Sequence, residues 1–313
     1  MLSKVTFSAE DFPSVTNKKI LCDAFHYLAR IGLVMRREQR QSFELTELGR
    51  QILQRASSFY VPHSYHAYME NFYSQLINKN AVQPVVDRVE NVIGSGRTHL
   101  RYFPFAISFL KRRISFDMIV DVGCGDGGFL SAILKVVLGK AVVGIDSAPI
   151  AVQMTRENLR KLHPDREIHM ICADAREVSN WGKKLEEIAK QRIMVLSLWF
   201  LIHEISQKEP SRVIDFLNQI HDFFPDASLI ICEIICHEDQ VLARHSRESL
   251  MPEYLFFHDL SGQGVLSWAD YQQILENIPY EIKLERLFDE VPDRAGNLVP
   301  SSFVWCLGPK KNS

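Results

Sequence analysis

The sequence predicts an α/β protein in which an open, mostly parallel sheet follows a smaller, mainly helical N-terminal domain. Strand-like and helix-like segments alternate from residue 118 to residue 235, as is typical of a parallel sheet covered by helices. A glycine-rich turn joins the first of these strands to the next helix. Near the N-terminus, the apolar pattern predicts a helix, a short hairpin and another helix in succession.

The chain is long enough for two domains. We expect a winged-helix-like domain over residues 1–100 and a sheet domain over residues 101–313. Segments 282–284 and 303–306 are predicted to close the sheet as its last strands.

The strongest local signal lies between residues 118 and 130. An apolar run ends at Asp121, glycines follow at positions 123 and 125, and a helical pattern begins at Phe129. Glycine lets the backbone bend sharply and approach a ligand closely, while the helix N-terminus offers free N–H groups. The spacing is Gly-x-Gly-x-Gly, which differs from the Gly-x-Gly-x-x-Gly/Ala pattern of nicotinamide binding.

Two further strand ends carry acidic residues. The predicted strand over 141–145 ends at Asp146, about 20 residues beyond the glycines, where a carboxylate can bind ribose hydroxyls. After a helix over 150–162, a strand over 168–172 runs into Asp174.

The stretches VDVGCGDGGFL, VVGIDSAP and HMICADAREV together resemble class I S-adenosylmethionine-dependent methyltransferases. The resemblance implies a Rossmann-like sheet whose glycine turn holds the methionine part of the cofactor. Asp146 would then bind the ribose and Asp174 the adenine amine. The cofactor-binding residues that it implies are Asp121, Gly123, Gly125, Asp146, Asp174 and Ala175.

The composition of the chain argues against several classes of binding partner. A net charge of −2 gives no general attraction for nucleic acid or anionic membranes. No apolar run reaches the roughly 18 residues of a membrane span, and the first 20 residues lack a signal-peptide core. Six scattered cysteines form no evident disulfide framework. We expect a cytoplasmic protein that acts on a small molecule, with no nucleic-acid or membrane partner.

The N-terminal region follows a winged-helix pattern. Helices are predicted over 17–31 and 46–53, with two short strands between them, and Arg36, Arg37 and Arg40 cluster at the hairpin tip. DNA binding is one interpretation, but three arginines on a near-neutral chain make a poor phosphate-binding surface. The pattern also resembles the N-terminal dimerisation domain of small-molecule O-methyltransferases, which implies a homodimer.

The stretch before the first strand of the sheet is rich in aromatic residues. His63 and His66 have a spacing that fits a metal pair on a helix, but we expect packing or a pocket wall there. Residues 94–105 are predicted to form a loop that can reach over the cofactor. Arg97 and Arg101 are candidates to bind a substrate carboxylate through two parallel hydrogen bonds, although each could equally be a surface arginine.

Two histidines follow the fourth and fifth predicted strands, which span 193–197 and 229–233. Ligands bind at the carboxyl ends of such strands. In O-methyltransferases a His-Asp-Trp histidine takes the proton of the acceptor hydroxyl. The corresponding residues here read His-Glu-Ile from His203, so the match is partial. His258 adds a second imidazole, and two histidines facing one pocket suit a transition metal with open positions for substrate.

The stretches SLWFLIHEIS, MPEYLFFHDLSGQG and VPSSFVWCL resemble a narrower family, the 2-oxo acid C-methyltransferases. These enzymes methylate the β-carbon of phenylpyruvate, 2-ketoarginine or similar acids. The resemblance implies that His203 and His258 bind iron or zinc, which chelates the substrate. Glu204, Asp259 or a metal-bound hydroxide could remove the β-proton. Either acid could instead support a ligating histidine, or pair with a basic substrate side chain.

Two other functions are compatible with the sequence. One is an O-methyltransferase that uses His203 as general base, which would survive treatment with a chelator. The other is a non-catalytic winged-helix protein that senses S-adenosylmethionine and binds DNA, since binding a cofactor does not require turnover.

Overall fold

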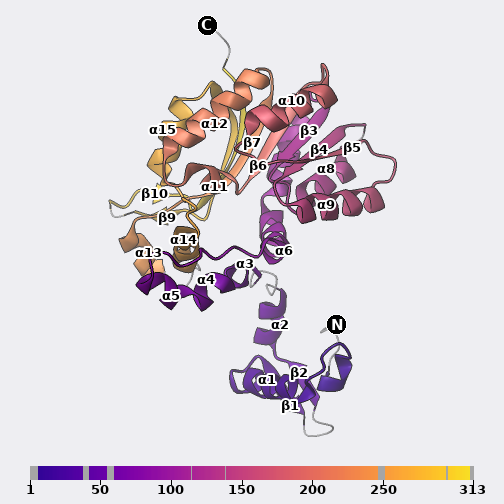
Figure 1. Cartoon of the computed structure of the whole chain (residues 1–313), viewed down its shortest axis with the longest axis vertical. Helices are drawn as coiled ribbons and strands as arrows, with labels where there is room; N and C mark the ends of the chain where they lie inside the picture. The colour runs from indigo at the N-terminus through magenta and orange to yellow at the C-terminus, as the bar shows by residue number, and fades with distance from the viewer. Residues whose placement is uncertain are drawn as a thin grey trace. The chain divides into compact units, whose positions relative to one another are not determined.

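In the computed structural model, the chain divides into two compact units, residues 1–59 and residues 60–313 (Figure 1). The domain boundary predicted from the sequence lies later, after residue 100. Segment 60–100 belongs with the sheet because Tyr65 and Tyr68 pack against Phe257 and Leu260. The structure describes residues 6–37, 42–54, 60–113, 115–137, 139–245, 251–293 and 295–310.

The first unit contains the predicted helix, hairpin and helix. Its elements are the 3₁₀ helix η1 (Ala9–Asp11), α1 (Lys18–Arg30), β1 (Val34–Arg37), β2 (Ser42–Leu45) and α2 (Glu47–Gln54). Asn17 caps α1 by accepting a hydrogen bond from the Ile20 N–H. Phe7, Phe25 and Phe43 form its small core.

The arginines of the hairpin tip are only partly described. Arg37 forms an ion pair with Glu44 on the opposite strand, so its charge is balanced within the hairpin. Arg40 lies outside the described residues.

The second unit contains a seven-stranded mixed sheet with the order β5-β4-β3-β6-β7-β11-β8. The five strands from β5 to β7 pair in parallel, and β11 pairs antiparallel with both β7 and β8. The predicted parallel sheet and its two closing strands are therefore confirmed. The strands are β3 (Met118–Val122), β4 (Ala141–Asp146), β5 (Ile168–Cys172), β6 (Met194–Trp199), β7 (Ser228–Ile234), β8 (Tyr280–Phe288) and β11 (Ser302–Pro309), with a separate pair β9 (Val291–Pro292) and β10 (Leu298–Val299).

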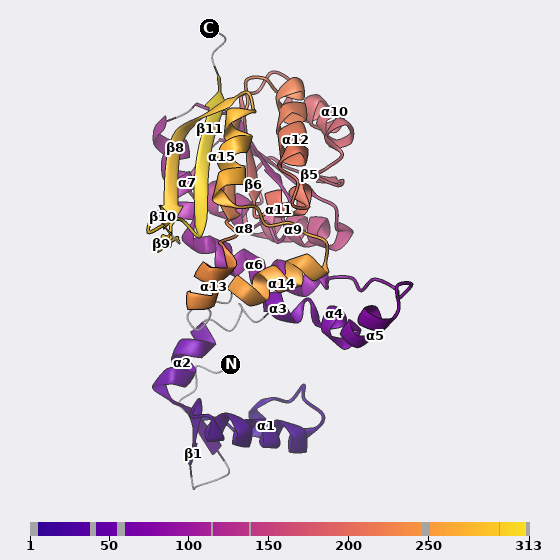
Figure 2. The ribbon, with the colours of Figure 1, turned by 90° about the vertical axis from the view of Figure 1, so that its left-hand side faces the viewer.

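Helices cover both faces of this sheet (Figure 2). Along β3, Ile119 enters one core and Val120 the other, because successive side chains of a strand point to opposite faces. One face packs against α7 (Phe103–Arg113), α8 (Gly128–Val136) and α9 (Pro149–Leu162). The other packs against α10 (Val178–Ala189), α12 (Pro210–Phe223) and α15 (Trp268–Glu276).

Shorter helices gather at one end of the sheet, where both views show α3, α6 and α14 close together (Figures 1 and 2). They are α3 (Tyr60–His63), α4 (His66–Glu70), α5 (Phe72–Ile77), α6 (Arg88–Thr98), the 3₁₀ helix η3 (His99–Arg101), α11 (Ile202–Ser206), α13 (Asp239–His245) and α14 (Met251–Leu260). None of the helices in the described ranges has the length and apolar character that a bilayer-spanning helix needs.

The prediction of a loop over residues 94–105 is wrong, because this segment is helical in α6, η3 and the start of α7. The glycines of this segment allow α6 to pack closely against its neighbours. A Cβ on Gly94 would lie 2.7 Å from the Val61 backbone nitrogen, and one on Gly96 would lie 2.6 Å from an Asp126 oxygen. Glycine in a helix costs only about 1 kcal/mol relative to alanine, which such contacts can offset.

Candidate active site

The glycine-rich turn connects β3 to α8 in left-handed backbone geometry. Gly123 and Gly125 have φ angles of 77° and 53°, a region that side chains with a Cβ rarely adopt. The Gly125 N–H donates a hydrogen bond to Asp146 Oδ2 at 3.0 Å, and the Gly125 carbonyl accepts one from Thr155 Oγ1 at 2.7 Å. The turn is therefore held from the end of β4 and from α9.

Asp146 organises this corner of the sheet. Its second carboxylate oxygen accepts a hydrogen bond from the Ala148 N–H at 2.9 Å. Burial raises the pKa of Asp146, and the two backbone hydrogen bonds oppose that rise. Its carboxylate thus positions the glycine turn, a role that its spacing from the glycines did not reveal.

Asp121 is buried one strand away from Ser197. The two residues lie opposite each other on β3 and β6, and Ser197 Oγ donates to Asp121 Oδ1 at 2.7 Å. Burial raises the pKa of Asp121 to about 8, although the serine hydrogen bond lowers it and nearby Asp146 and Asp126 raise it further. A protonated carboxyl group is therefore favoured in the folded chain up to that pH.

This raised pKa gives Asp121→Asn a pH-dependent effect on stability. Unfolding releases the proton of Asp121 at any pH between its ordinary pKa and about 8, so this group destabilises the fold progressively as pH rises through that window. We expect the Tm of the variant, relative to the original chain, to be higher at pH 8.5 than at pH 5. Calorimetry without cofactor measures this difference, and equal Tm differences at both pH values would contradict it.

Asp174 and Ala175 lie just beyond β5. Asp174 pairs with Arg176 through both carboxylate oxygens, at 2.6 to 3.2 Å, and this hydrogen bonding holds the pKa of Asp174 below its usual value. The Ala175 carbonyl accepts a hydrogen bond from the indole N–H of Trp181 at 2.9 Å. The adenine role of Asp174 stays a prediction, and it would require the carboxylate to share or exchange Arg176.

His203 is buried on α11 just after β6, with 4% of its surface exposed. Its ring Nδ1 lies 3.0 and 3.1 Å from the two carboxylate oxygens of Glu233, and its backbone N–H donates to the same carboxylate. Glu233 is fully buried on β7, the strand next to β6. Burial by itself would lower the pKa of His203, but the charge and hydrogen bond of Glu233 raise it above its ordinary value.

His258 reaches the same place from α14. It is 3% exposed, and its Nδ1 lies 2.6 Å from the Tyr254 carbonyl oxygen, while the Tyr254 ring stacks on the imidazole at 3.7 Å. Burial and then the nearby His203 lower the pKa of His258 to about 3, so this imidazole is neutral at physiological pH. The centroids of the two histidine rings are 4.8 Å apart, with a 75° angle between their planes.

The turn after α14 ties both histidines together. The Gln263 N–H donates to the His258 carbonyl at 2.9 Å, and the Gly264 N–H donates to the His203 carbonyl at 2.8 Å. A Cβ on Gly264 would lie 1.9 Å from the Lys208 backbone nitrogen, so only glycine fits. Each imidazole therefore has its backbone anchored and its Nδ1 facing an acceptor, which leaves Nε2 as the nitrogen for a ligand.

Glu233→Gln should move the acid limb of the pH–rate profile. Without the Glu233 charge, burial lowers the pKa of His203, so the neutral imidazole survives to lower pH. We expect the acid limb of kcat/KM to shift to lower pH. Glu285→Gln, whose carboxylate accepts the Trp305 indole N–H on another strand, is the matched control. An unmoved limb would show that Glu233 does not set this protonation.

Glu204 lies at the edge of the histidine pair. Its Oε1 accepts hydrogen bonds from Arg88 Nη1 at 3.0 Å and from Gln263 Nε2 at 3.5 Å. Its side chain is 34% exposed and that of Arg88 is 44% exposed, so the pair is open to solvent and to ligands. Arg88 is the first residue of α6, and sequence patterns gave no indication of its role.

The structure does not bring all predicted site residues together. Asp259 pairs with Lys208 at 2.6 Å, and more than half of each side chain is exposed. Arg101 forms an ion pair with Asp289 and lies over the Tyr102 ring. Arg97 lies on α6, but its side chain is outside the described residues.

A third histidine borders this region. His99 stacks on Phe200 with 4.2 Å between ring centroids, and Phe200 has a left-handed φ of 51° in the turn that leads to His203. Burial, followed by the proximity of His203, lowers the pKa of His99 to about 3. Sequence patterns did not indicate three residues of this region, because each contacts the site only through the tertiary fold. They are His99, Glu233 and Tyr254.

Comparison with known proteins identifies a domain family for part of this chain and structures of similar fold. Residues 119–219 match a family model described as a methyltransferase domain. Carboxy-S-adenosyl-L-methionine synthase of Shewanella sp. (strain ANA-3) is 23% identical over 209 residues, which cover 66% of this chain and 73% of that protein. The same enzyme of Shewanella oneidensis is 24% identical over the same shares of both chains.

Solved O-methyltransferase structures share the fold. A mitomycin 7-O-methyltransferase aligns with a TM-score of 0.63 and 15% identity, over 98% of this chain and 89% of its own. An O-methyltransferase family protein from Burkholderia thailandensis also has a TM-score of 0.63, with 10% identity, over 100% and 91% of the two chains. An O-methyltransferase from neocarzinostatin biosynthesis, solved with S-adenosyl-L-homocysteine and 1,4-dihydroxy-2-naphthoic acid, aligns at 0.54 and 12% identity over 96% and 89%.

The family match covers β3, the glycine turn and β4 through α12, the part of the sheet that carries Asp121, Asp146 and His203. The complete mixed sheet with helices on both faces is the fold of the methyltransferase structures. Residues 119–219 therefore match a methyltransferase domain, and the chain has the Rossmann-like fold of the solved methyltransferase structures.

Proposed function

We propose that this protein is an S-adenosylmethionine-dependent methyltransferase that acts on the β-carbon of a 2-oxo acid, with a transition metal held by His203 and His258. The observation that carries the proposal is the convergence of two buried imidazoles whose ring centroids are 4.8 Å apart. They come from α11 and α14, which lie far apart in the sequence. Simple deprotonation of a hydroxyl needs only one such group.

The chemistry of the donors fits a metal. Each Nδ1 faces an acceptor, the Glu233 carboxylate for His203 and the Tyr254 carbonyl for His258. Acceptors of this kind fix the tautomer and orientation of metal-ligating histidines. Among the described residues, no third histidine, cysteine or carboxylate completes a close trio of ligand atoms with this pair. Two protein donors would leave coordination positions for a chelating substrate and for solvent.

A bound metal would supply Lewis acidity, which stabilises negative charge on the keto oxygen of the acceptor. Glu204 lies beside the histidines, and we assign it the removal of the β-proton in preference to the solvent-exposed Asp259. The β-carbon then forms a bond to the methyl carbon as the sulfonium–methyl bond breaks, and neutral S-adenosylhomocysteine leaves. Arg88 and Gln263 hold Glu204 in place by hydrogen bonds to Oε1.

A cavity of about 400 Å³ offers room for the acceptor side chain. It lies beside Ile234, next to Glu233 on β7, and Met251, on the same helix as His258. Tyr102 forms another wall, and Asp289 gives the cavity an acidic edge where it pairs with Arg101. Its lining mixes apolar side chains with polar and charged ones, which gives a small acceptor both kinds of contact.

The decisive assay incubates the enzyme with S-adenosylmethionine and a pool of 2-oxo acids, and follows each acid by mass spectrometry. Gain of one CH₂ by a 2-oxo acid, with loss of the activity on chelation and recovery on adding iron or zinc, supports the proposal. Methylation of phenols or alcohols only, at a rate that a chelator does not change, would refute it.

A second function is favoured by a specific contact. Glu233 bonded to Nδ1 makes His203 a well-oriented general base, which is the arrangement that an O-methyltransferase needs. The O-methyltransferases among the similar structures are compatible with this reading. Activity that survives treatment with a chelator would favour the O-methyltransferase. Specific binding of genomic DNA in a gel shift at physiological salt would instead favour the non-catalytic winged-helix protein.

We also infer a homodimer that the N-terminal unit holds together. One face of α1 exposes Ile20 and Tyr27, which lie seven positions apart, and Ile31 at the C-cap of the helix is also exposed on that side. An exposed apolar stripe of this kind marks an interaction surface. Light scattering of the purified chain measures the mass, and charged substitutions at Tyr27 and Ile31 should yield monomers.

A further inference from the structure

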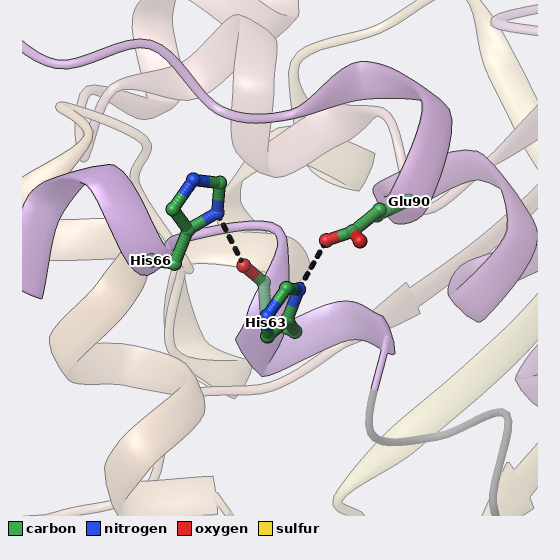
Figure 3. A group of neighbouring side chains, drawn as sticks. All are labelled: His63, His66 and Glu90. Carbon is green, nitrogen blue, oxygen red and sulfur yellow. Dashed lines mark hydrogen bonds and ion pairs between the residues drawn. The ribbon is translucent and has the colours of Figure 1, made fainter. Parts of the chain in front are cut away.

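We propose that His63, His66 and Glu90 form a second metal site, which takes a divalent transition metal such as Zn²⁺ at the surface beside the active site (Figure 3). One ligand atom of each residue lies within 4.8 Å of those of the other two. Among the described residues, this is the one group of three histidine, cysteine or carboxylate side chains with such spacing. The site is separate from the His203 and His258 pair and does not depend on the function proposed above.

The donor set suits zinc. Two imidazoles and one carboxylate are the protein ligands of a common class of zinc sites, in which water takes the fourth position. His63 Nδ1 lies 2.5 Å from Glu90 Oε2, and a bound ion would replace this contact with two metal–ligand bonds. The rings of His63 and His66 stack with centroids 5.3 Å apart, and both side chains are at least partly exposed, so they have room to turn toward an ion between them and Glu90.

The backbone beneath these ligands is rigid. Ser64, between the two histidines, is fully buried, and its carbonyl accepts the Asp87 N–H at 2.8 Å. Its hydroxyl donates to the Val61 carbonyl and accepts from Asn91 Nδ2. These bonds tie the α3–α4 turn to the first turns of α6, the helix that carries Glu90. Ligands on a pre-organised frame lose little entropy when the ion binds.

The α3–α4 turn and the first turns of α6 also contact residues of the candidate active site. Tyr65, between the two histidines, is 1% exposed, and its ring lies 5.8 Å from that of His258. Two residues before Glu90, Arg88 holds Glu204. An ion at this surface would therefore stiffen the segments that position both Tyr65 and Arg88, and its effect on stability is measurable without any assay of turnover.

The experiment first removes the two buried histidines of the candidate active site by substitution. A variant with His203→Ala and His258→Ala is titrated with Co²⁺, and the visible absorption of the bound ion and the stoichiometry are recorded. We expect one equivalent to bind, with a Co²⁺ affinity at least about tenfold lower after His66→Ala or Glu90→Gln. Zn²⁺ should also raise Tm by about 2 °C or more in the parent, and not after His66→Ala.

Two further variants separate ligation from general effects. His169→Ala is the matched control, because His169 pairs with Glu167 at the surface without a third ligand, and it should leave binding unchanged. Gly94→Ala should weaken binding, since its Cβ would push α3 away from α6. If the double variant does not fold, the original chain serves instead, and His66→Ala should remove one equivalent from it. No bound equivalent, or binding that His66→Ala leaves intact, would overturn the proposal.

Discussion

Replacing either His203 or His258 with alanine is expected to lower kcat/KM by about a thousandfold or more. Both imidazoles are buried and anchored through Nδ1, so alanine removes the ring nitrogen and leaves a cavity in its place. Affinity for S-adenosylmethionine, measured by calorimetry, should change little because the glycine turn and Asp146 are untouched. Metal content should fall in both variants if the two rings share one ion.

The comparison of the two variants also separates the candidate functions. An O-methyltransferase with His203 as base would lose activity in His203→Ala and retain much of it in His258→Ala. His163→Ala, a histidine that contacts Ser131 at a distance from this pair, is the control for loss of an imidazole. Full activity and full metal content in both variants would end the metal proposal.

Asp146→Ala is expected to weaken S-adenosylmethionine binding by about a hundredfold. The carboxylate accepts hydrogen bonds from the Gly125 and Ala148 N–H groups, and hydrogen bonds to a charged group contribute about 1.5–3 kcal/mol each. Losing them frees the glycine turn, and also removes the predicted contact to the ribose. Equilibrium binding by calorimetry or fluorescence measures the change in Kd.

Two related variants test this explanation. Asp146→Asn should fall between the original chain and alanine, because an amide oxygen can still accept one of the two hydrogen bonds. Asp117→Ala is the control, since this aspartate accepts the Ile193 N–H where β3 and β6 begin, at the opposite end of the parallel strands from Asp146. A cofactor affinity in Asp146→Ala equal to that of the control would show that Asp146 neither positions the turn nor contacts the cofactor.

The strands of the sheet could be predicted because local patterns determine them. The segment at 118–122 is apolar apart from Asp121, the segment at 168–172 is apolar apart from His169, and both form strands where they were predicted. The glycine turn was recognisable because Gly123 and Gly125 occupy left-handed backbone conformations that other residues rarely adopt. Strand ends then located His203, since the carboxyl end of β6 is a fixed place in such a sheet.

Contacts between distant segments were beyond the reach of sequence patterns. Glu233 looked like an ordinary strand residue, yet its buried carboxylate holds His203 on α11, the helix that follows the neighbouring strand β6. Asp259 looked like a partner of His258, but successive residues of a helix point about 100° apart, so it faces Lys208 at the surface. The glycines at 94 and 96 indicated a loop, whereas they permit α6 to pack against Val61 and Asp126.

The sequence by itself determined the sheet, the position of its glycine turn and the positions of the two histidines that follow β6 and β7, because periodicity and strand ends are local properties. Only the tertiary structure decided that α14 folds back to place His258 beside His203, and which carboxylates face the pair. That decision depends on burial and on hydrogen bonds such as the one from Gly264 to His203, which join residues far apart in the chain.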